Sequence, residues 1–318
     1  MRLRPLLLSA FVGLTLSSGN AWACSSCGCT LNTDLGSQGI VTGSGWRLYL
    51  RYDLVDQDQL RSGDAAVTPP PLPTSQEIEQ ETRSGYTTLG LGYGINRRWS
   101  LDLQLPWIDR HHSTYAAGDT VLSSSDSDSL SDVRLLARYA GFANDMSTGF
   151  TFGLKLPTGS HDTTFAAGPQ AGQRLDRSLQ PGSGTTDLLL GVYHFDDFGP
   201  QSGWFANALY QHALTESDGF KPGDTVNLNL GLRYYWGDIL TPQLQINAQV
   251  RGHDTDPDPT GHLSSGGRVL YISPGFTFMV NDSWHGHVFV QLPVYQQVYG
   301  LQLAPTRILS IGMSYAFR

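Results

Sequence analysis

Lysine is nearly absent from this chain. Of 318 residues, 20 are Lys or Arg, and only Lys155 and Lys221 are lysines. A surface in contact with water normally carries lysine freely, because the charged end of this side chain stays solvated. The scarcity of lysine therefore indicates that something other than water covers much of the exterior. The formal net charge is −8 and no basic patch is present, which argues against nucleic acid as a partner.

Long apolar runs are also missing beyond the first residues. Arg2 and Arg4 precede an apolar stretch at 6–16, and a small-x-small cleavage site follows, so residues 1–23 are predicted to be a secretory signal peptide. No later stretch reaches the roughly 18 to 20 apolar residues of a membrane helix. Gly (36 residues) and Pro (17 residues) are frequent and no helical period runs far, which favours an all-β chain.

The C-terminal segment alternates strictly. Its large apolar positions are Leu309, Ile311, Met313, Tyr315 and Phe317, and the positions between them are small. Because side chains on a strand alternate between two faces, one face is large and apolar and the other is small. A strand of this kind at the end of the chain is typical of bacterial outer-membrane barrels, whose assembly machinery reads it. The sequence thus predicts two partners, the barrel-assembly machinery and the outer-membrane lipid with its lipopolysaccharide.

Twelve segments alternate well enough to be strands. They lie at 45–57, 83–95, 99–109, 130–141, 147–157, 184–195, 203–213, 224–236, 242–252, 267–280, 284–294 and 305–317. The connections alternate between long and short, as an even-numbered barrel with both termini at one end requires. We therefore predict one all-β domain at 45–318, a transmembrane antiparallel up-and-down β-barrel of about 12 strands, in the outer membrane of a Gram-negative bacterium.

Tryptophan placement supports a membrane barrel. The tryptophans at predicted short-turn ends are Trp46, Trp99, Trp204, Trp236 and Trp284, and Trp107 falls at the opposite end. Aromatic rings prefer the membrane interface, so this pattern predicts a girdle. The alternative is a secreted soluble barrel, which also alternates but turns its apolar face inward.

If the apolar stripe faces lipid, the opposite stripe lines a lumen. The residues assigned to that lumen are Arg51, Asp53, Asp102, Asp132, Arg134, Arg138, Lys155, Asp187, Arg233 and Arg251. A barrel of this size leaves a narrow passage that a few side chains can constrict. Arg and Asp that face each other across it would filter solutes by charge, with Arg51, Arg134, Arg138 and Arg251 as the positive side. The alternative is that these charges pair and fill the interior of a closed barrel.

Three short motifs resemble a known family. They are Leu156-Pro157-Thr158-Gly159, the glycine-rich stretch 180–191 and Gln291-Leu292-Pro293-Val294-Tyr295-Gln296. They resemble outer-membrane proteins of the phenol-degradation MetA-pathway type. The resemblance implies a transporter-like barrel for small solutes such as aromatic compounds. It also implies that Asp187 is an inward Asp that follows a glycine turn.

All three cysteines lie within six residues near the predicted mature N-terminus. The spacing of Cys24, Cys27 and Cys29 is compatible with a soft metal such as copper, with a redox disulfide, or with a structural disulfide that leaves one thiol over. Acylation of Cys24 as a lipid anchor is a further alternative. We expect residues 24–44 to form a Cys-rich periplasmic segment, with a redox or metal partner if the thiols are functional. No other cofactor is predicted.

Weaker signals point to other chemistry. His111 and Ser113 resemble the catalytic pair of outer-membrane phospholipase, but no third group is identifiable, and we predict that the chain is not an enzyme. His285 and His287 share lumen-facing parity, which a metal site would need. The acidic stretch that begins at Asp254 lacks the glycine and the distal glutamate of a calcium loop, so a solvated loop is the expectation.

Overall fold

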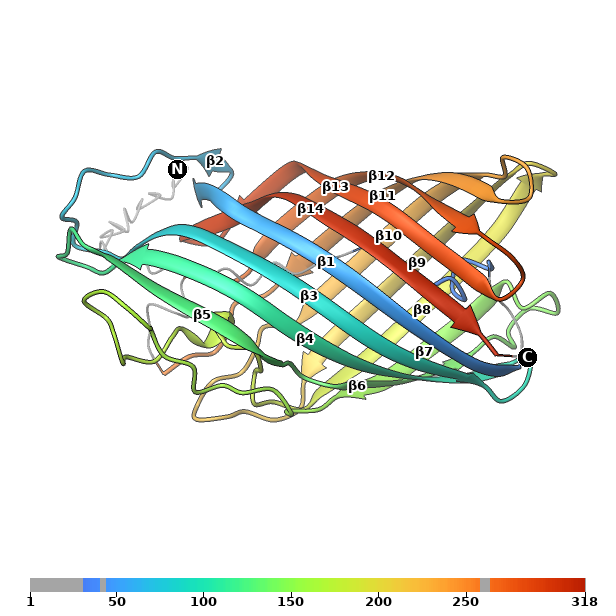
Figure 1. Ribbon diagram of the computed structural model, residues 1–318, viewed down its shortest axis with the longest axis horizontal. Helices are drawn as coiled ribbons and strands as arrows, with labels where there is room; N and C mark the ends of the chain where they lie inside the picture. Colours follow the sequence, from blue (N-terminus) through green and yellow to red (C-terminus); the bar gives the residue numbers. More distant parts are fainter. Residues whose placement is uncertain (1–30, 41–43, 258–263, 318) are drawn as a thin grey trace, which may run out of the picture.

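The computed structural model describes residues 31–40, 44–257 and 264–317, and its body is a closed antiparallel barrel (Figure 1). Twelve strands form the wall, each paired with the next, and the last pairs with the first. They are β1 (Gly45–Ser62), β3 (Ile78–Gly94), β4 (Trp99–Tyr115), β6 (Arg134–Tyr139), β7 (Thr148–Lys155), β8 (Asp187–Gly199), β9 (Ser202–Ala213), β10 (Thr225–Tyr234), β11 (Leu240–Arg251), β12 (Gly267–Met279), β13 (Trp284–Val298) and β14 (Leu301–Ala316). The predicted fold class is confirmed.

Three short elements complete the secondary structure of the described residues. β2 (Ala65–Ala66) pairs with the end of β1, and η1 (Arg177–Leu179) is a single 3-10 turn in a long loop. β5 (Leu122–Leu130) pairs with one half of β4, and β6 pairs with the other half. β5 and β6 thus follow one another at the same place in the wall, and residues 131–133 interrupt the strand between them.

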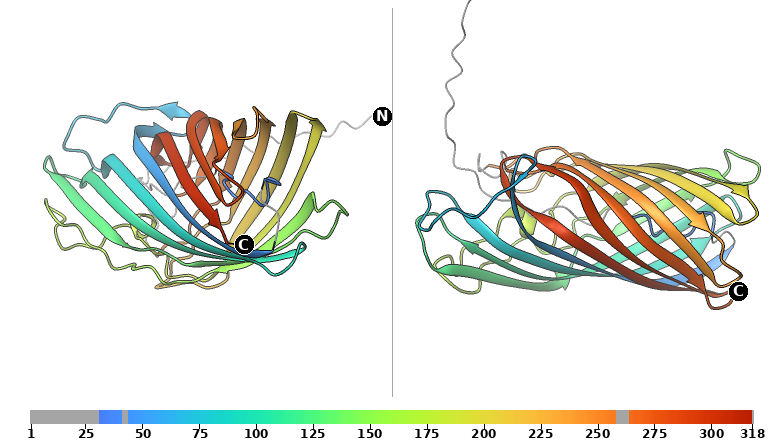
Figure 2. Two further views of the ribbon diagram at one scale, coloured as in Figure 1. Left: turned by 45° about the vertical axis from the view of Figure 1, so that its right-hand side comes forward. Right: turned by 90° about the horizontal axis from the view of Figure 1, so that it is seen from above.

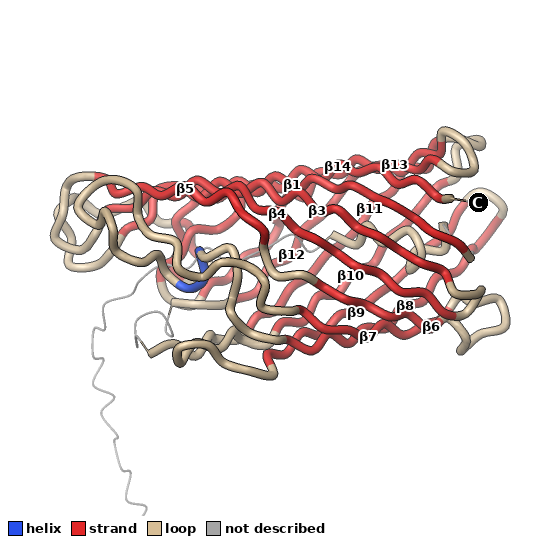
Figure 3. The backbone as a smooth tube through the Cα atoms, turned by 60° about the horizontal axis from the view of Figure 1, so that its bottom comes forward, coloured by secondary structure: helices blue, strands red, loops and turns tan. Residues whose placement is uncertain are grey.

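The two ends of the barrel differ, as Figure 3 shows. The short-turn end has connections at 95–98, 140–147, 200–201, 235–239 and 280–283. The long-loop end has connections at 63–77, 116–121, 156–186, 214–224, 252–266 and 299–300. β1 begins and β14 ends at the short-turn end, so the chain enters and leaves the barrel wall at the same end (Figure 2).

The exterior is apolar and the interior is polar. On β14, Ile311 is 48% exposed while its neighbour Ser310 is completely buried. Leu50 on β1 and Leu232 on β10 are also about half exposed to the outside. A soluble barrel has the opposite arrangement, so this surface is suited to lipid rather than water. Within the described residues, no helix is long and apolar enough to span a membrane.

An aromatic girdle marks the short-turn edge of the apolar surface. Trp46 packs on Tyr93 with ring centroids 4.5 Å apart, and Trp284 packs on Tyr315 at 4.8 Å. Both tryptophans are outward and exposed. Such pairs place amphipathic rings where lipid head groups meet the hydrocarbon. Trp107 lies at the other edge of the apolar surface, as predicted.

Several strands run further toward the long-loop end than the sequence predicts. The predicted loop 110–129 is the hairpin of β4 and β5, and the predicted loop 295–304 is a two-residue turn between β13 and β14. The reason is that the polarity of the two faces inverts. Past Leu54 the outward face of β1 carries Asp56, whereas Val55 and Leu60 point inward and are buried. A strand whose outside is polar no longer matches the pattern that identifies a lipid-facing strand.

Candidate functional site: the barrel lumen

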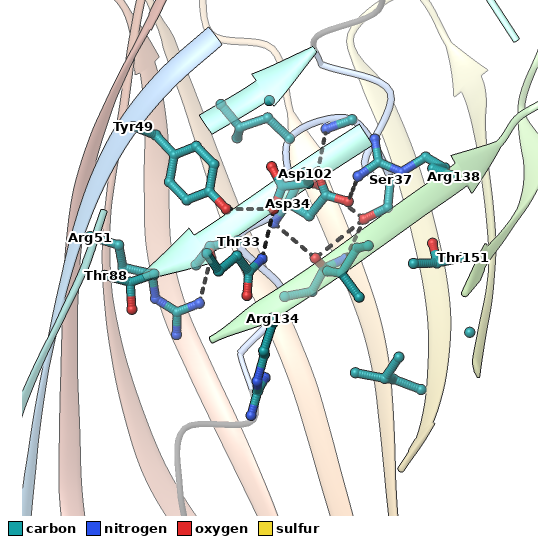
Figure 4. A pocket seen from close by; sticks show the side chains of 18 of the residues that line it. Thr33, Asp34, Ser37, Tyr49, Arg51, Thr88, Asp102, Arg134, Arg138 and Thr151 are labelled. Carbon is teal, nitrogen blue, oxygen red and sulfur yellow. Dashed lines mark hydrogen bonds and ion pairs between the residues drawn. The ribbon is translucent and has the colours of Figure 1, made fainter. Parts of the chain in front are cut away.

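A piece of the N-terminal chain lies inside the barrel. Residues 31–40 occupy the lumen toward the short-turn end (Figure 2), and Figure 4 shows Thr33, Asp34 and Ser37 of this stretch among the wall side chains. Leu31, Leu35 and Gln38 are buried. We call residues 31–40 the lumen segment. The sequence predicts that residues 24–44 lie outside the barrel, and this is wrong for the lumen segment. Its polar side chains find partners on the polar inner wall, so burial costs it few unsatisfied groups.

Side chains from four wall strands hold the lumen segment. Arg51 Nη1 on β1 donates to Thr33 Oγ1 at 2.7 Å, and Gln245 Nε2 on β11 donates to the carbonyl of Asn32 at 3.1 Å. Arg138 on β6 forms an ion pair with Asp34, and Arg233 on β10 donates to the carbonyl of Gln38. The four contacts come from separate parts of the wall, so the segment is fixed in the lumen rather than lying against one strand.

The Asp34–Arg138 ion pair makes docking of the lumen segment depend on pH. Burial alone would raise the pKa of Asp34, but the charges of Arg138 and Arg47 outweigh it and hold this pKa below its ordinary value of 3.8. A carboxyl with a lowered pKa in the docked state stabilises docking above its ordinary pKa, and this contribution is lost as pH falls through the lowered value.

We therefore expect single-channel conductance to be constant from about pH 5 to 8 and to rise only below about pH 4, as the segment loosens. Asp34→Asn should show the raised conductance already at neutral pH, because the amide carries no charge to pair with Arg138. Asp145→Asn is the matched control, since Asp145 lies in a short turn and, among the residues that the structure describes, hydrogen-bonds only Ser147. Identical pH profiles for wild type and Asp34→Asn would contradict this role of the ion pair.

A cavity of about 750 Å³ runs beside the lumen segment. At the short-turn end its lining includes Arg47 and His285, and toward the long-loop end it includes Arg177 and Arg251. Most of its wall comes from β1, β3, β4, β6, β7 and β8, and residues 31–37 of the lumen segment form part of its lining. The segment thus narrows the lumen and leaves this cavity beside it as a passage.

The passage has an excess of positive charge. Its lining contains ten basic side chains and six aspartates, and no glutamate. The chain as a whole carries a formal charge of −8, so basic residues are concentrated here against the overall trend. A low-dielectric wall strengthens the effect of such charges on a permeating ion.

The charged residues assigned to the lumen do line it, but they do not form one ring. Nine of the ten line the cavity, and Arg233 contacts the lumen segment. Arg51 pairs with Asp53 two residues away on its own strand, and Arg251 pairs with Asp254 at the long-loop end. The prediction that Arg and Asp face each other across the passage is therefore wrong for these pairs, which are local.

The tightest charge cluster is buried at the interruption between β5 and β6. Lys155 Nζ lies 2.7 Å from Asp132 Oδ2 and 3.2 Å from Asp187 Oδ2, and the three side chains are 7%, 6% and 1% exposed. Asp132 also accepts hydrogen bonds from the backbone N–H groups of Gly159 and Ser183. This Lys155 cluster ties the loop 156–186 to the wall and closes the interruption.

Two of the family-like motifs meet at the Lys155 cluster. The Thr158 hydroxyl bridges the break, since its Oγ1 accepts from the N–H of Val133 and donates to the carbonyl of Ser131. Gly159 and Gly182 approach so closely that a Cβ on Gly182 would lie 2.4 Å from the carbonyl oxygen of Gly159. These glycines are required by backbone contact, so the structure gives both motifs a structural role.

Three features of the lumen were not found from the sequence. The lumen segment has no alternation that would reveal it. Arg47 is not among the residues that the sequence assigns to the lumen, although it lines the cavity. Arg110 falls in a predicted loop; it is buried and donates to Ser84, to Tyr86 and to the carbonyl of Leu179.

The weaker candidate sites do not assemble. Within the described residues, no hydrogen bond joins His111 to Ser113, and His111 Nδ1 instead contacts Asp126 at 2.8 Å on the exterior. No group of three or more metal-ligating side chains occurs there either, so His285 and His287 stand without a third ligand. Asp254 is buried rather than solvated, contrary to the expectation for its loop. Cys24, Cys27 and Cys29 and the signal peptide lie outside the described residues.

Comparison with known proteins identifies the fold. No family model and no curated protein matches the sequence. The crystal structure of an outer-membrane channel from Pseudomonas putida F1 is similar with a TM-score of 0.61 at 13% identity, over 87% of this chain and 97% of that one. Two further structures are more distant. The monoaromatic hydrocarbon channel CymD has a TM-score of 0.48 at 13% identity, over 94% of this chain and 95% of that one. The Ralstonia pickettii toluene transporter TbuX has a TM-score of 0.46 at 10% identity, over 87% of this chain and 90% of that one. The chain thus has the barrel fold of an outer-membrane channel.

Proposed function

We propose that this protein is an outer-membrane channel that lets small solutes diffuse across the membrane and favours anions. The observation that carries the proposal is the cavity beside the lumen segment, with its excess of basic side chains. The apolar exterior and the aromatic girdle support a place in the membrane. In an outer-membrane barrel the short turns face the periplasm and the long loops face the outside of the cell, so the short-turn end is the periplasmic end.

The resemblance to MetA-pathway proteins remains a finer proposal. It would make aromatic compounds the solutes, and two of the distant structural neighbours carry such compounds in their names. The inner wall of this barrel is rich in charged and amide side chains, so a solute with a polar group suits it better than a bare hydrocarbon.

A closed, structural barrel is the second candidate. The observation in its favour is that the lumen segment and the Lys155 cluster fill part of the interior. Planar-bilayer recording on detergent-purified, heat-modifiable protein separates the two. We expect discrete current steps, and swelling of proteoliposomes in small sugars or amino acids. A folded protein that gives neither would contradict the channel and favour the closed barrel.

A further inference from the structure

Arg134 is a basic side chain of the passage without a partner among the described residues. Arg134 on β6 lines the cavity and forms no ion pair or hydrogen bond with the described residues, and no interaction line reaches it in Figure 4. By contrast Arg51, Arg138 and Lys155 each contact a carboxylate. An unpaired guanidinium in a confined site is unfavourable unless something else balances it.

The carboxylates that influence Arg134 are already engaged. Asp132 and Asp187 act on Arg134 through their charge, but both are in contact with Lys155. Counted together, the two cations and the two carboxylates balance, which explains how the wall tolerates Arg134. The hydrogen-bonding fork of Arg134 nevertheless remains unused. Such a fork matches the two oxygens of a carboxylate.

The surroundings of Arg134 are apolar on one side. Its neighbour on the inward face of β6 is Leu136, and its cross-strand partner Gln104 is followed on β4 by Pro106 and Ile108. Tyr86 on β3 also lines this part of the cavity. A cation beside aliphatic and aromatic walls fits a molecule with one anionic group and an apolar body.

We propose that Arg134 and these apolar side chains form a binding subsite for small organic carboxylates, such as aromatic acids. The proposal rests on the channel function and adds the class of solute. Because the local charges balance, the bound acid is held weakly, and weak binding lets it leave again and so permits transport.

Benzoate is the probe. In bilayers carrying chloride current, we expect benzoate to reduce the current of the wild-type channel in a concentration-dependent way, and benzyl alcohol at the same concentration to leave it unchanged. Arg134→Gln should raise the half-blocking concentration about tenfold, because a charge-assisted contact is lost. Arg134→Lys should give an intermediate value, because it keeps the charge and loses the fork.

Arg98→Gln is the matched control, since Arg98 is another cation of the cavity lining without an ion pair in the described residues, and it lies in the short turn 95–98. It should shift the half-blocking concentration less than about twofold. Each variant is first checked for the heat-modifiable folded form; if Arg134→Gln does not fold, Arg134→Lys carries the test. Equal block of wild type and folded Arg134 variants, or equal block by benzyl alcohol, would overturn the subsite. A wild-type channel that carries chloride without benzoate block would also overturn it but leave the channel standing, whereas absence of any current would overturn both.

Discussion

Replacing residues 31–40 by a glycine-serine segment of equal length should raise single-channel conductance about two- to fivefold. The lumen of a barrel of this size is narrow, so side chains that fill part of its cross-section lower the conductance strongly. Buried side chains of the lumen segment, Leu31 and Leu35 among them, occupy space that water and ions would then enter. The replacement keeps the length of the chain before β1 and removes the side chains that Arg138 and Gln243 bind.

The barrel itself should survive this replacement. The wall partners of the lumen segment are Arg51, Arg138, Arg233, Gln243 and Gln245. These side chains would be solvated by the water that enters, so the folded form should still shift on gels after heating. A variant that replaces only the loop residues 116–121 is the control and should leave the conductance at the wild-type value. Unchanged conductance in the folded 31–40 variant would show that the segment does not obstruct the passage.

Lys155→Met should destabilise the barrel by about 3 to 5 kcal/mol, the range found when one partner of a buried ion pair is removed. Asp132 and Asp187 would be left as two buried carboxylates with no cation in contact. Loss of the folded, heat-modifiable band with urea, compared with wild type, measures the change.

Lys221→Met provides a matched control, because Lys221 is the only other lysine and forms no ion pair within the described residues. Its effect should be within about 1 kcal/mol. Adding Asp132→Asn and Asp187→Asn to Lys155→Met should restore part of the stability, since the uncompensated charge is then gone. A Lys155→Met barrel as stable as wild type would contradict the structural role of the cluster.

The sequence predicts the fold well because lipid imposes one rule on every strand. Leu309, Ile311 and Met313 must face outward, so alternation alone locates β14 and sets its two faces. The same rule correctly turns Arg134 and Lys155 inward. It fails beyond the membrane edge, where Asp56 and Arg307 pair on the outside and Val55 is buried inside.

The interior is harder to predict, because contacts in the lumen join residues far apart in the sequence. Gln38 contacts Arg233 and Gln243, which lie approximately two hundred residues further along the sequence. Parity gives the direction of a side chain, but it does not give its height in a tilted, staggered barrel. It therefore identifies Arg51 and Arg251 as inward without showing that one contacts the lumen segment and the other the acidic loop.

The most direct test of the proposed channel is the reversal potential of the wild-type protein across a bilayer with a potassium chloride gradient. The ten basic and six acidic side chains of the passage predict that chloride is more permeant than potassium, and that the preference weakens at high salt as the charges are screened. A reversal potential of the sign expected for chloride would support the proposed function. A cation-selective reversal potential, or the absence of current through folded protein, would contradict it.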